Sequence, residues 1–182
     1  MIKDLENIEV GDILGYVASG EIGQIIDLLT PGNKVHVSTY IGDGTIIESH
    51  IETGVVEKIL NPKWFPYITV YGWKDHLTDE EKDAFVKELK KAVGWKYNLV
   101  GFVPTFFRSV IGQMVKCPWL MGLKQLVGND RDSAYCSELL MRITRCRWAL
   151  KRNRVFRPDL SPRCGTPDDV TDKNPLLYIK EK

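Results

Sequence analysis

The sequence predicts an α+β fold in which an antiparallel β-sheet packs against helices. Apolar and polar residues alternate from 35 to 51 around a Gly-rich turn, which is typical of a β-hairpin. Two further strand patterns follow at 54–59 and 67–73 with no helix between them, so neighbouring strands are expected to pair antiparallel. The 182 residues fit one domain spanning 1–182, with an apolar helical insert at about 98–127.

The hairpin is expected to turn through the three residues Gly42 to Gly44, with Gly44 in the left-handed conformation. This register puts His36 opposite His50 and gives two faces. The apolar face comprises Val35, Val37, Ile41, Ile47 and Ile51, and the polar face comprises His36, Ser38, Tyr40, Glu48 and His50. Glu48 is then the diagonal neighbour of His36, at a backbone spacing of roughly 7–8 Å that side chains can bridge. A two-residue Asp43-Gly44 turn would shift the pairing by one residue and mix Glu48 with the valines.

The flanking elements follow from local signals. A turn and a short strand are expected at 8–14, a helix at 21–29, and a closing edge strand at 176–179. The helix predicted over 79–93 has Thr78 as its N-cap and Glu81 as its capping box. Its buried stripe is expected to contain Phe85, Leu89, Ala92 and Val93.

A second helix is expected to begin after the polar loop 129–133, with Asp132 or Ser133 as its N-cap. This places Cys136 in the first turn. The apolar face of this helix would run through Leu139, Leu140, Ile143, Cys146 and Leu150, so Cys136 would point toward the core.

Composition excludes several classes of function. A net charge of +1 gives no bulk attraction to nucleic acid. The four cysteines, Cys117, Cys136, Cys146 and Cys164, show no metal-binding spacing, so neither a metal nor another cofactor is expected. No signal-peptide pattern opens the chain and no uncharged apolar run reaches about 18 residues. The expected location is therefore cytoplasmic, or the cell envelope if a signal sequence has been removed.

The helix start and the polar hairpin face together suggest nucleophilic chemistry. A thiol at a helix N-terminus meets unpaired N–H groups and the positive end of the helix dipole, and both favour the thiolate. Cys136 would be the nucleophile, His36 the general base and then acid, and Glu48 the group that orients His36. The Cys136 N–H would donate to the oxyanion. The alternatives are a cysteine that is a small core residue and a histidine with a structural role, while His50 is the alternative third group.

Three motifs carry a family resemblance. GDIL at 11–14, HVSTYIGDGTIIES at 36–49 and YCSELL at 135–140 resemble the circularly permuted branch of the NlpC-like papain-fold hydrolases. The closest pattern is that of the YiiX-like bacterial proteins, and the lecithin:retinol acyltransferases are more distant relatives. The resemblance implies a permuted papain-like fold, because the His-bearing hairpin precedes the Cys-bearing helix. It assigns nucleophile, base and third polar residue to Cys136, His36 and Glu48.

The resemblance extends to the stretch 94–98, where Asn98 stands in place of the family's usual Asp. Tyr40, Tyr97 and Tyr135 lie within these motifs and are the expected substrate-binding residues. The implied activity is hydrolysis of an amide bond, in a peptidoglycan-like or other peptide, through a thioester.

Two other functions remain open at the level of the sequence. One is a lipid or thioester acyl hydrolase or acyltransferase, for which the aromatic insert and the basic stretch 142–157 would suit an anionic membrane surface. The simpler interpretation of the basic stretch is a helix face exposed to solvent. The other function is that of a non-catalytic binding module built on a papain-like shell.

Overall fold

The computed structural model of the protein describes residues 7–17, 34–98, 133–145, 167, 170–172 and 174–180. The elements in chain order are β1 (Ile13–Val17), β2 (Lys34–Gly42), β3 (Thr45–His50), β4 (Gly54–Ile59), the 3₁₀ helix η2 (Pro62–Tyr67), β5 (Ile68–Trp73), α2 (Asp79–Ala92), α4 (Cys136–Ile143) and β6 (Leu177–Ile179).

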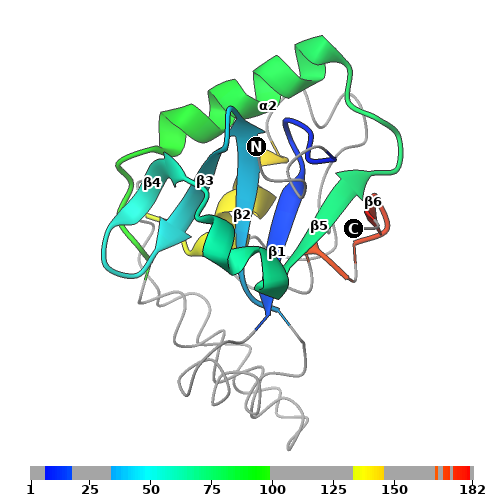
Figure 1. The fold of residues 1–182 in the computed structure, drawn as a ribbon. Helices are drawn as coiled ribbons and strands as arrows, with labels where there is room; N and C mark the ends of the chain where they lie inside the picture. Colours follow the sequence, from blue (N-terminus) through cyan, green and yellow to red (C-terminus); the bar gives the residue numbers. More distant parts are fainter. Residues whose placement is uncertain are drawn as a thin grey trace, which may run out of the picture.

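The strands form one six-stranded sheet in the order β4-β3-β2-β1-β5-β6, and every neighbouring pair is antiparallel (Figure 1). The predicted α+β class is confirmed, as are the strands over 54–59 and 67–73 and the closing strand at one edge. The strand β1 follows the expected turn, where Gly11 has a positive φ of 95°.

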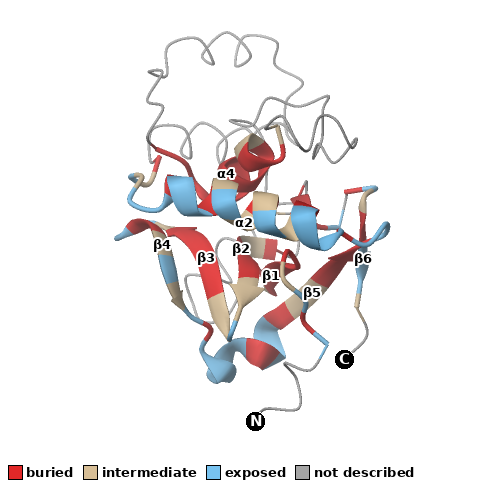
Figure 2. Cartoon of the chain, turned by 90° about the horizontal axis from the view of Figure 1, so that it is seen from above, coloured by how far each residue is buried: buried red, intermediate tan, exposed pale blue. Residues whose placement is uncertain are grey.

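Helices α2 and α4 cover one face of the sheet, while η2 lies on the other (Figure 2). The larger core forms between the helices and the sheet, and it includes Val37, Ile47, Phe85, Leu89, Ala92, Cys136, Leu139 and Leu140. The capping box of α2 forms as predicted between Thr78 and Glu81. Val93, which was expected in the buried stripe, is 41 % exposed because the helix ends at Ala92 and the chain turns to extended backbone.

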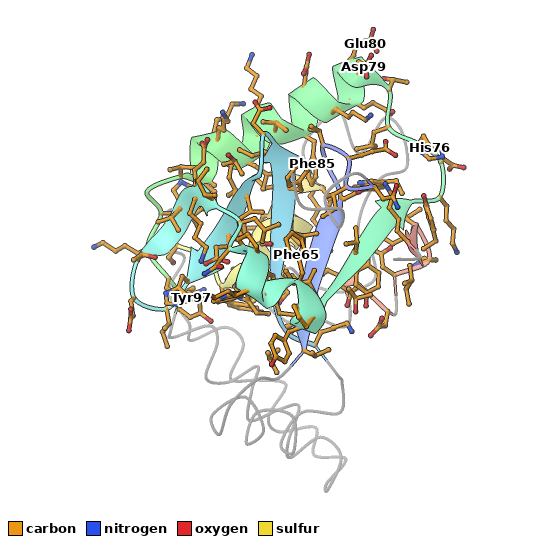
Figure 3. The ribbon with its side chains drawn as sticks, viewed as in Figure 1. Phe65, His76, Asp79, Glu80, Phe85 and Tyr97 are labelled. Atoms are coloured by element: carbon orange, nitrogen blue, oxygen red, sulfur yellow. The ribbon has the colours of Figure 1, made fainter. Side chains whose placement is uncertain are left out.

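The second face of the sheet is buried as well. Its core contains Ile8, Leu14, Tyr16, Tyr40, Ile46, Leu60, Phe65 and Ile68, with Phe65 supplied by η2 (Figure 3). The predicted polar face of the hairpin is therefore covered over much of its length, and Ser38, Tyr40 and Glu48 are buried there. Ile51, which was predicted to be apolar and buried, is 54 % exposed because β3 ends at His50.

The hairpin turn differs from the prediction. Asp43 and Gly44 form a two-residue turn with φ angles of 51° and 71°, and Gly42 pairs with Thr45. The three-residue loop is therefore wrong. The register then shifts between Tyr40 and Gly42, so that Ser38 pairs with Glu48 just as the three-residue loop would have required. This β-bulge cancels the slip of the shorter turn and keeps Glu48 on the face of His36.

The helix α4 begins with Cys136, as expected, but its N-cap is Tyr135. Ser133, one of the two predicted caps, instead forms an isolated parallel bridge with Lys96. The predicted helix 21–29, the insert at 99–127, Asp132, Cys146, Leu150 and most of the basic stretch lie outside the described residues. Among the helices that are described, none is long and apolar enough to cross a membrane.

Candidate active site

Cys136 sits at the first position of α4, above β2, and it is 5 % exposed. Its sulfur is hydrogen-bonded by the backbone N–H groups of Val37 and Ser137. One donor comes from the sheet and one from the first turn of the helix. A sulfur at this place therefore meets two fixed positive dipoles that favour the thiolate.

The start of α4 is tied to the sheet by a short series of hydrogen bonds. Ser49 of β3 is fully buried, and its hydroxyl donates to the carbonyl of Ala134 at 2.5 Å. The Ala134 N–H donates to the carbonyl of Lys96 at 3.0 Å. These contacts fix the chain two residues before Cys136, so the sulfur is held against β2 by the backbone and not by its own packing alone.

Glu138 completes this anchor from inside the first turn of α4. Its carboxylate, which is fully buried, accepts from Asn98 Nδ2 at 3.0 Å and from the Tyr135 N–H at 3.4 Å. Arg142, one turn further on, donates to its other oxygen at 2.5 Å. The helix start is thus stabilised by a carboxylate that accepts hydrogen bonds on both oxygens and is paired with the charge of Arg142 on one of them.

The histidine and the carboxylate of the hairpin meet as the sequence predicts. His36 Nε2 lies 3.0 Å from Glu48 Oε2, and Lys58 Nζ lies 2.6 Å from Glu48 Oε1. The His36 ring is 21 % exposed. Because Nε2 faces Glu48, the hydrogen bond between His36 and Cys136 falls to Nδ1.

The pKa values of these groups shift in the directions that an ion pair requires. Burial lowers the pKa of His36, but the charge of Cys136, the hydrogen bond to it and the contact with Glu48 outweigh burial and raise the pKa to about 10. Burial raises the pKa of the Cys136 thiol, and the positive charge of His36 with three hydrogen bonds lowers it below its ordinary value. The preferred state is therefore thiolate and imidazolium.

Glu48 stays ionised throughout this range. Burial raises its pKa, whereas the hydrogen bond and charge of His36, followed by those of Lys58, lower the pKa to about 2. Glu48 can consequently orient His36 and compensate its charge at any pH near neutrality.

The three candidate tyrosines have different surroundings. Tyr97 lies near both Cys136 and Glu138: burial and the negative charges of these two groups raise the pKa of its hydroxyl, which stays protonated. Figure 3 shows Tyr97 toward the end of the sheet opposite Asp79 and Glu80. Tyr135 is 2 % exposed and caps α4, so it packs in the core beside the cysteine.

The structure does not bring Tyr40 to the site. Its hydroxyl accepts from the Gly44 N–H at 3.0 Å and so closes the hairpin turn. Four residues of strand separate Tyr40 from His36, a distance of roughly 13 Å along the chain. His50, the alternative third group, accepts from the Glu52 N–H at 3.3 Å in the turn after β3.

Sequence reasoning missed Lys58, Ser49 and Glu138 as parts of the site. Lys58 lies on β4 directly across from Ile46, which is two residues from Glu48 along β3 and on the same face. The alternation of β4 could have placed it on this face, but only after the register with β3 was known. The signal for Glu138 was its position three residues after the N-cap, which is the capping-box position.

The fold and the site together define an antiparallel α+β structure in which a half-buried histidine contacts a buried cysteine and a buried glutamate. No family model matches the chain, and no curated protein matches it in sequence. Among the solved structures that are similar in fold is the protein described as "metalloprotein yiiX from Escherichia coli O157:H7, DUF1105". The TM-score is 0.57 at 14 % identity, over 96 % of this chain and 97 % of that one. This chain therefore has a YiiX-like fold.

Proposed function

We propose that this protein is a cysteine hydrolase that cleaves an amide bond through a thioester intermediate. One observation carries the proposal. Cys136 at the start of α4 contacts His36, and the far nitrogen of that ring lies 3.0 Å from the buried carboxylate of Glu48. Nucleophile, acid–base group and orienting group thus stand in the order that nucleophilic catalysis requires.

In the first half of the reaction, the Cys136 thiolate attacks the amide carbonyl carbon and forms a carbon–sulfur bond. The carbonyl oxygen becomes an oxyanion. When the tetrahedral intermediate collapses, the carbon–nitrogen bond breaks, His36 gives its Nδ1 proton to the leaving nitrogen, and the products are an amine and a thioester. Glu48 holds the ring in place for this transfer.

In the second half, neutral His36 takes a proton from water as the water oxygen attacks the thioester. The carbon–sulfur bond breaks, the acid is released, and Cys136 leaves as a thiolate beside the regenerated imidazolium. The ion pair of the resting site is thereby restored.

Two groups are placed to stabilise the oxyanion. The Cys136 N–H is at the N-terminus of α4, where it has no partner within the helix. The hydroxyl of Tyr97 is close to Cys136 and remains protonated, so it can donate a hydrogen bond. We assign Tyr97 this role as the substrate-contacting member of the three tyrosines.

The chain order supports a permuted papain-like arrangement, since the His-bearing β2 precedes the Cys-bearing α4. The motifs at 36–49 and 135–140 resemble those of permuted NlpC-like hydrolases, which favours peptidoglycan-like or other peptide amides as substrates. The acyl-ester reaction uses the same thioester and differs only in the leaving group.

The description of yiiX as a metalloprotein raises the question of a metal here. Among the described residues, no group of three His, Cys, Asp or Glu side chains is arranged to hold a metal ion. Glu48 faces His36 through one oxygen and the ammonium of Lys58 through the other. A divalent cation does not fit a carboxylate that is already paired in this way, so the mechanism contains no metal step.

The test is a substrate panel of muropeptides and long-chain acyl esters, run on the wild type and on Cys136→Ala. Release of an amine from the muropeptides by the wild type alone would support the proposal. Turnover of acyl esters alone would replace amide hydrolysis by lipid hydrolysis at the same site. Equal turnover by both proteins would refute the mechanism, and mass spectrometry of a trapped acyl-Cys136 peptide would confirm the intermediate.

A further inference from the structure

Three charged side chains lie in a diagonal row across three neighbouring strands. Ser38 pairs with Glu48 between β2 and β3, and Ile46 pairs with Lys58 between β3 and β4. His36 and Lys58 are therefore the diagonal neighbours of Glu48 on its two sides. The distances are 3.0 Å from His36 Nε2 to Oε2 and 2.6 Å from Lys58 Nζ to Oε1, so each oxygen faces one nitrogen.

Lys58 is held in this position by aromatic rings. Its ammonium lies 5.3 Å from the centroid of the Trp64 ring of η2. Trp64 packs edge-on against Tyr16 at 5.6 Å, and Tyr16 lies 5.3 Å from the His36 ring. The same aromatic group thus contacts both partners of Glu48. An ammonium over a tryptophan face is stabilised there by the ring quadrupole.

A buried carboxylate needs a cation at every stage of the reaction. Glu48 is 1 % exposed, and an uncompensated charge at such a place would take up a proton. His36 is a cation only until it gives its proton to the leaving group. The reaction takes no proton from Lys58, whose nitrogen lies 2.6 Å from the other oxygen of Glu48.

We propose that Lys58 is a positioning residue of the Cys136 site, acting through Glu48: its ammonium occupies Oε1, keeps the carboxylate ionised and leaves Oε2 turned toward His36. This inference rests on the proposed function, in which Cys136 and His36 are the reacting groups. It adds to Cys136, His36 and Glu48 a further residue that touches neither substrate nor sulfur.

The test follows the Glu48 carboxyl by ¹³C NMR during an acid titration of the full chain, in the wild type, Lys58→Met and Lys58→Arg. We expect the wild-type carboxyl to stay ionised to about pH 2. In Lys58→Met its pKa should rise by about one unit or more, a tenfold gain in proton affinity, and Lys58→Arg should restore it. Lys90→Met is the matched control. Lys90 of α2 pairs at 3.8 Å with Glu57, the neighbour of Lys58 in β4, and both side chains of this pair are exposed.

If Lys58 had a purely structural role, Lys58→Met would lower the stability of the protein but leave the pKa of Glu48 unchanged. Lys58→Arg would then have no shift in that pKa to restore. An unchanged Glu48 titration in Lys58→Met would therefore overturn the inference. Alkylation of Cys136 in the wild type separates the two proposals. If Cys136 is reactive in the wild type but the pKa of Glu48 is unchanged in Lys58→Met, only the role of Lys58 is rejected. If Cys136 is unreactive but the pKa of Glu48 rises in Lys58→Met, the hydrolase is rejected and the pairing of Lys58 with Glu48 is supported.

Discussion

Removal of the His36 ring should abolish the low-pH reactivity of Cys136. Burial alone would raise the pKa of this thiol, and the lowered pKa depends first on the positive charge of His36. Two unit charges about 4 Å apart interact with about 4 kcal/mol at an effective dielectric constant of 20. An energy of that size corresponds to roughly a thousandfold difference in thiolate population.

The expected pH dependence follows from the directions of the two shifts. In the wild type, the pKa of the Cys136 thiol is lowered, so the thiolate extends below the ordinary thiol range, and the imidazolium persists until the pH approaches 10. In His36→Gln, a thiol with an ordinary pKa of about 8.5 is only about 0.3 % thiolate at pH 6, so alkylation should slow by a factor of about 300 or more. The mutant rate should then rise about tenfold per pH unit, as a simple thiol does.

The assay is the rate of iodoacetamide labelling of Cys136 between pH 5 and 9, read by mass spectrometry of the peptide that contains it. Peptide-level detection separates Cys136 from Cys117, Cys146 and Cys164. His50→Gln is the matched control, since His50 bonds only to the Glu52 N–H in an exposed turn as far as the described contacts go. Coincident profiles for wild type and His36→Gln, both rising near pH 8.5, would refute the ion pair.

Three further outcomes test other parts of the site. Glu48→Gln should remove about 3 kcal/mol of acid-sensitive stability, because the pKa of Glu48 is lowered from 4.5 to about 2. The contribution of Glu48 is complete above pH 4.5 and is lost as the pH falls through 2, and urea unfolding across this range would measure it. Tyr97→Phe should reduce kcat by roughly 10²-fold with little change in KM, and a change confined to KM would reject its role at the oxyanion. Gly54→Ala should lower the free energy of unfolding in urea by about 1–3 kcal/mol, and by more than Gly44→Ala does. Both glycines have φ near 70°, but of the two only Gly54 would place a Cβ against a backbone atom, the Trp95 oxygen.

The sequence was sufficient to predict which residues of the hairpin would meet. The alternation in β2 and β3 placed His36 and Glu48 on one face, and the structure joins them at 3.0 Å. The turn itself was mispredicted, because Asp-Gly satisfies a two-residue turn as well as it satisfies part of a longer one. The bulge at Ile41 has no signal in the alternation. The local pattern therefore predicts which residues share a face of the hairpin, whereas the turn and the bulge that produce the register depend on packing.

The start of the Cys136 helix shows the opposite case, in which a strong local signal was overridden. Ser133 is a better N-cap than Tyr135 by intrinsic preference, yet it bridges to Lys96. Residues 134 and 135 stay extended because Ser49 and Lys96 bind the Ala134 backbone. Long-range hydrogen bonds thus delay the helix by two residues and make Cys136 its first member.

The side chain of Asn98 also stabilises the start of α4. In the motif that 94–98 resembles, an aspartate is usual at the position of Asn98. In the structure, Asn98 Nδ2 donates to Glu138, which is buried at the first turn of α4. An aspartate would set two carboxylates against each other at this point, and one of them would have to bind a proton. Asn98 and Glu138 are therefore matched side chains, and the choice of one constrains the other. Since this pair also holds the helix that begins with Cys136, the residue at 98 bears on where the sulfur lies.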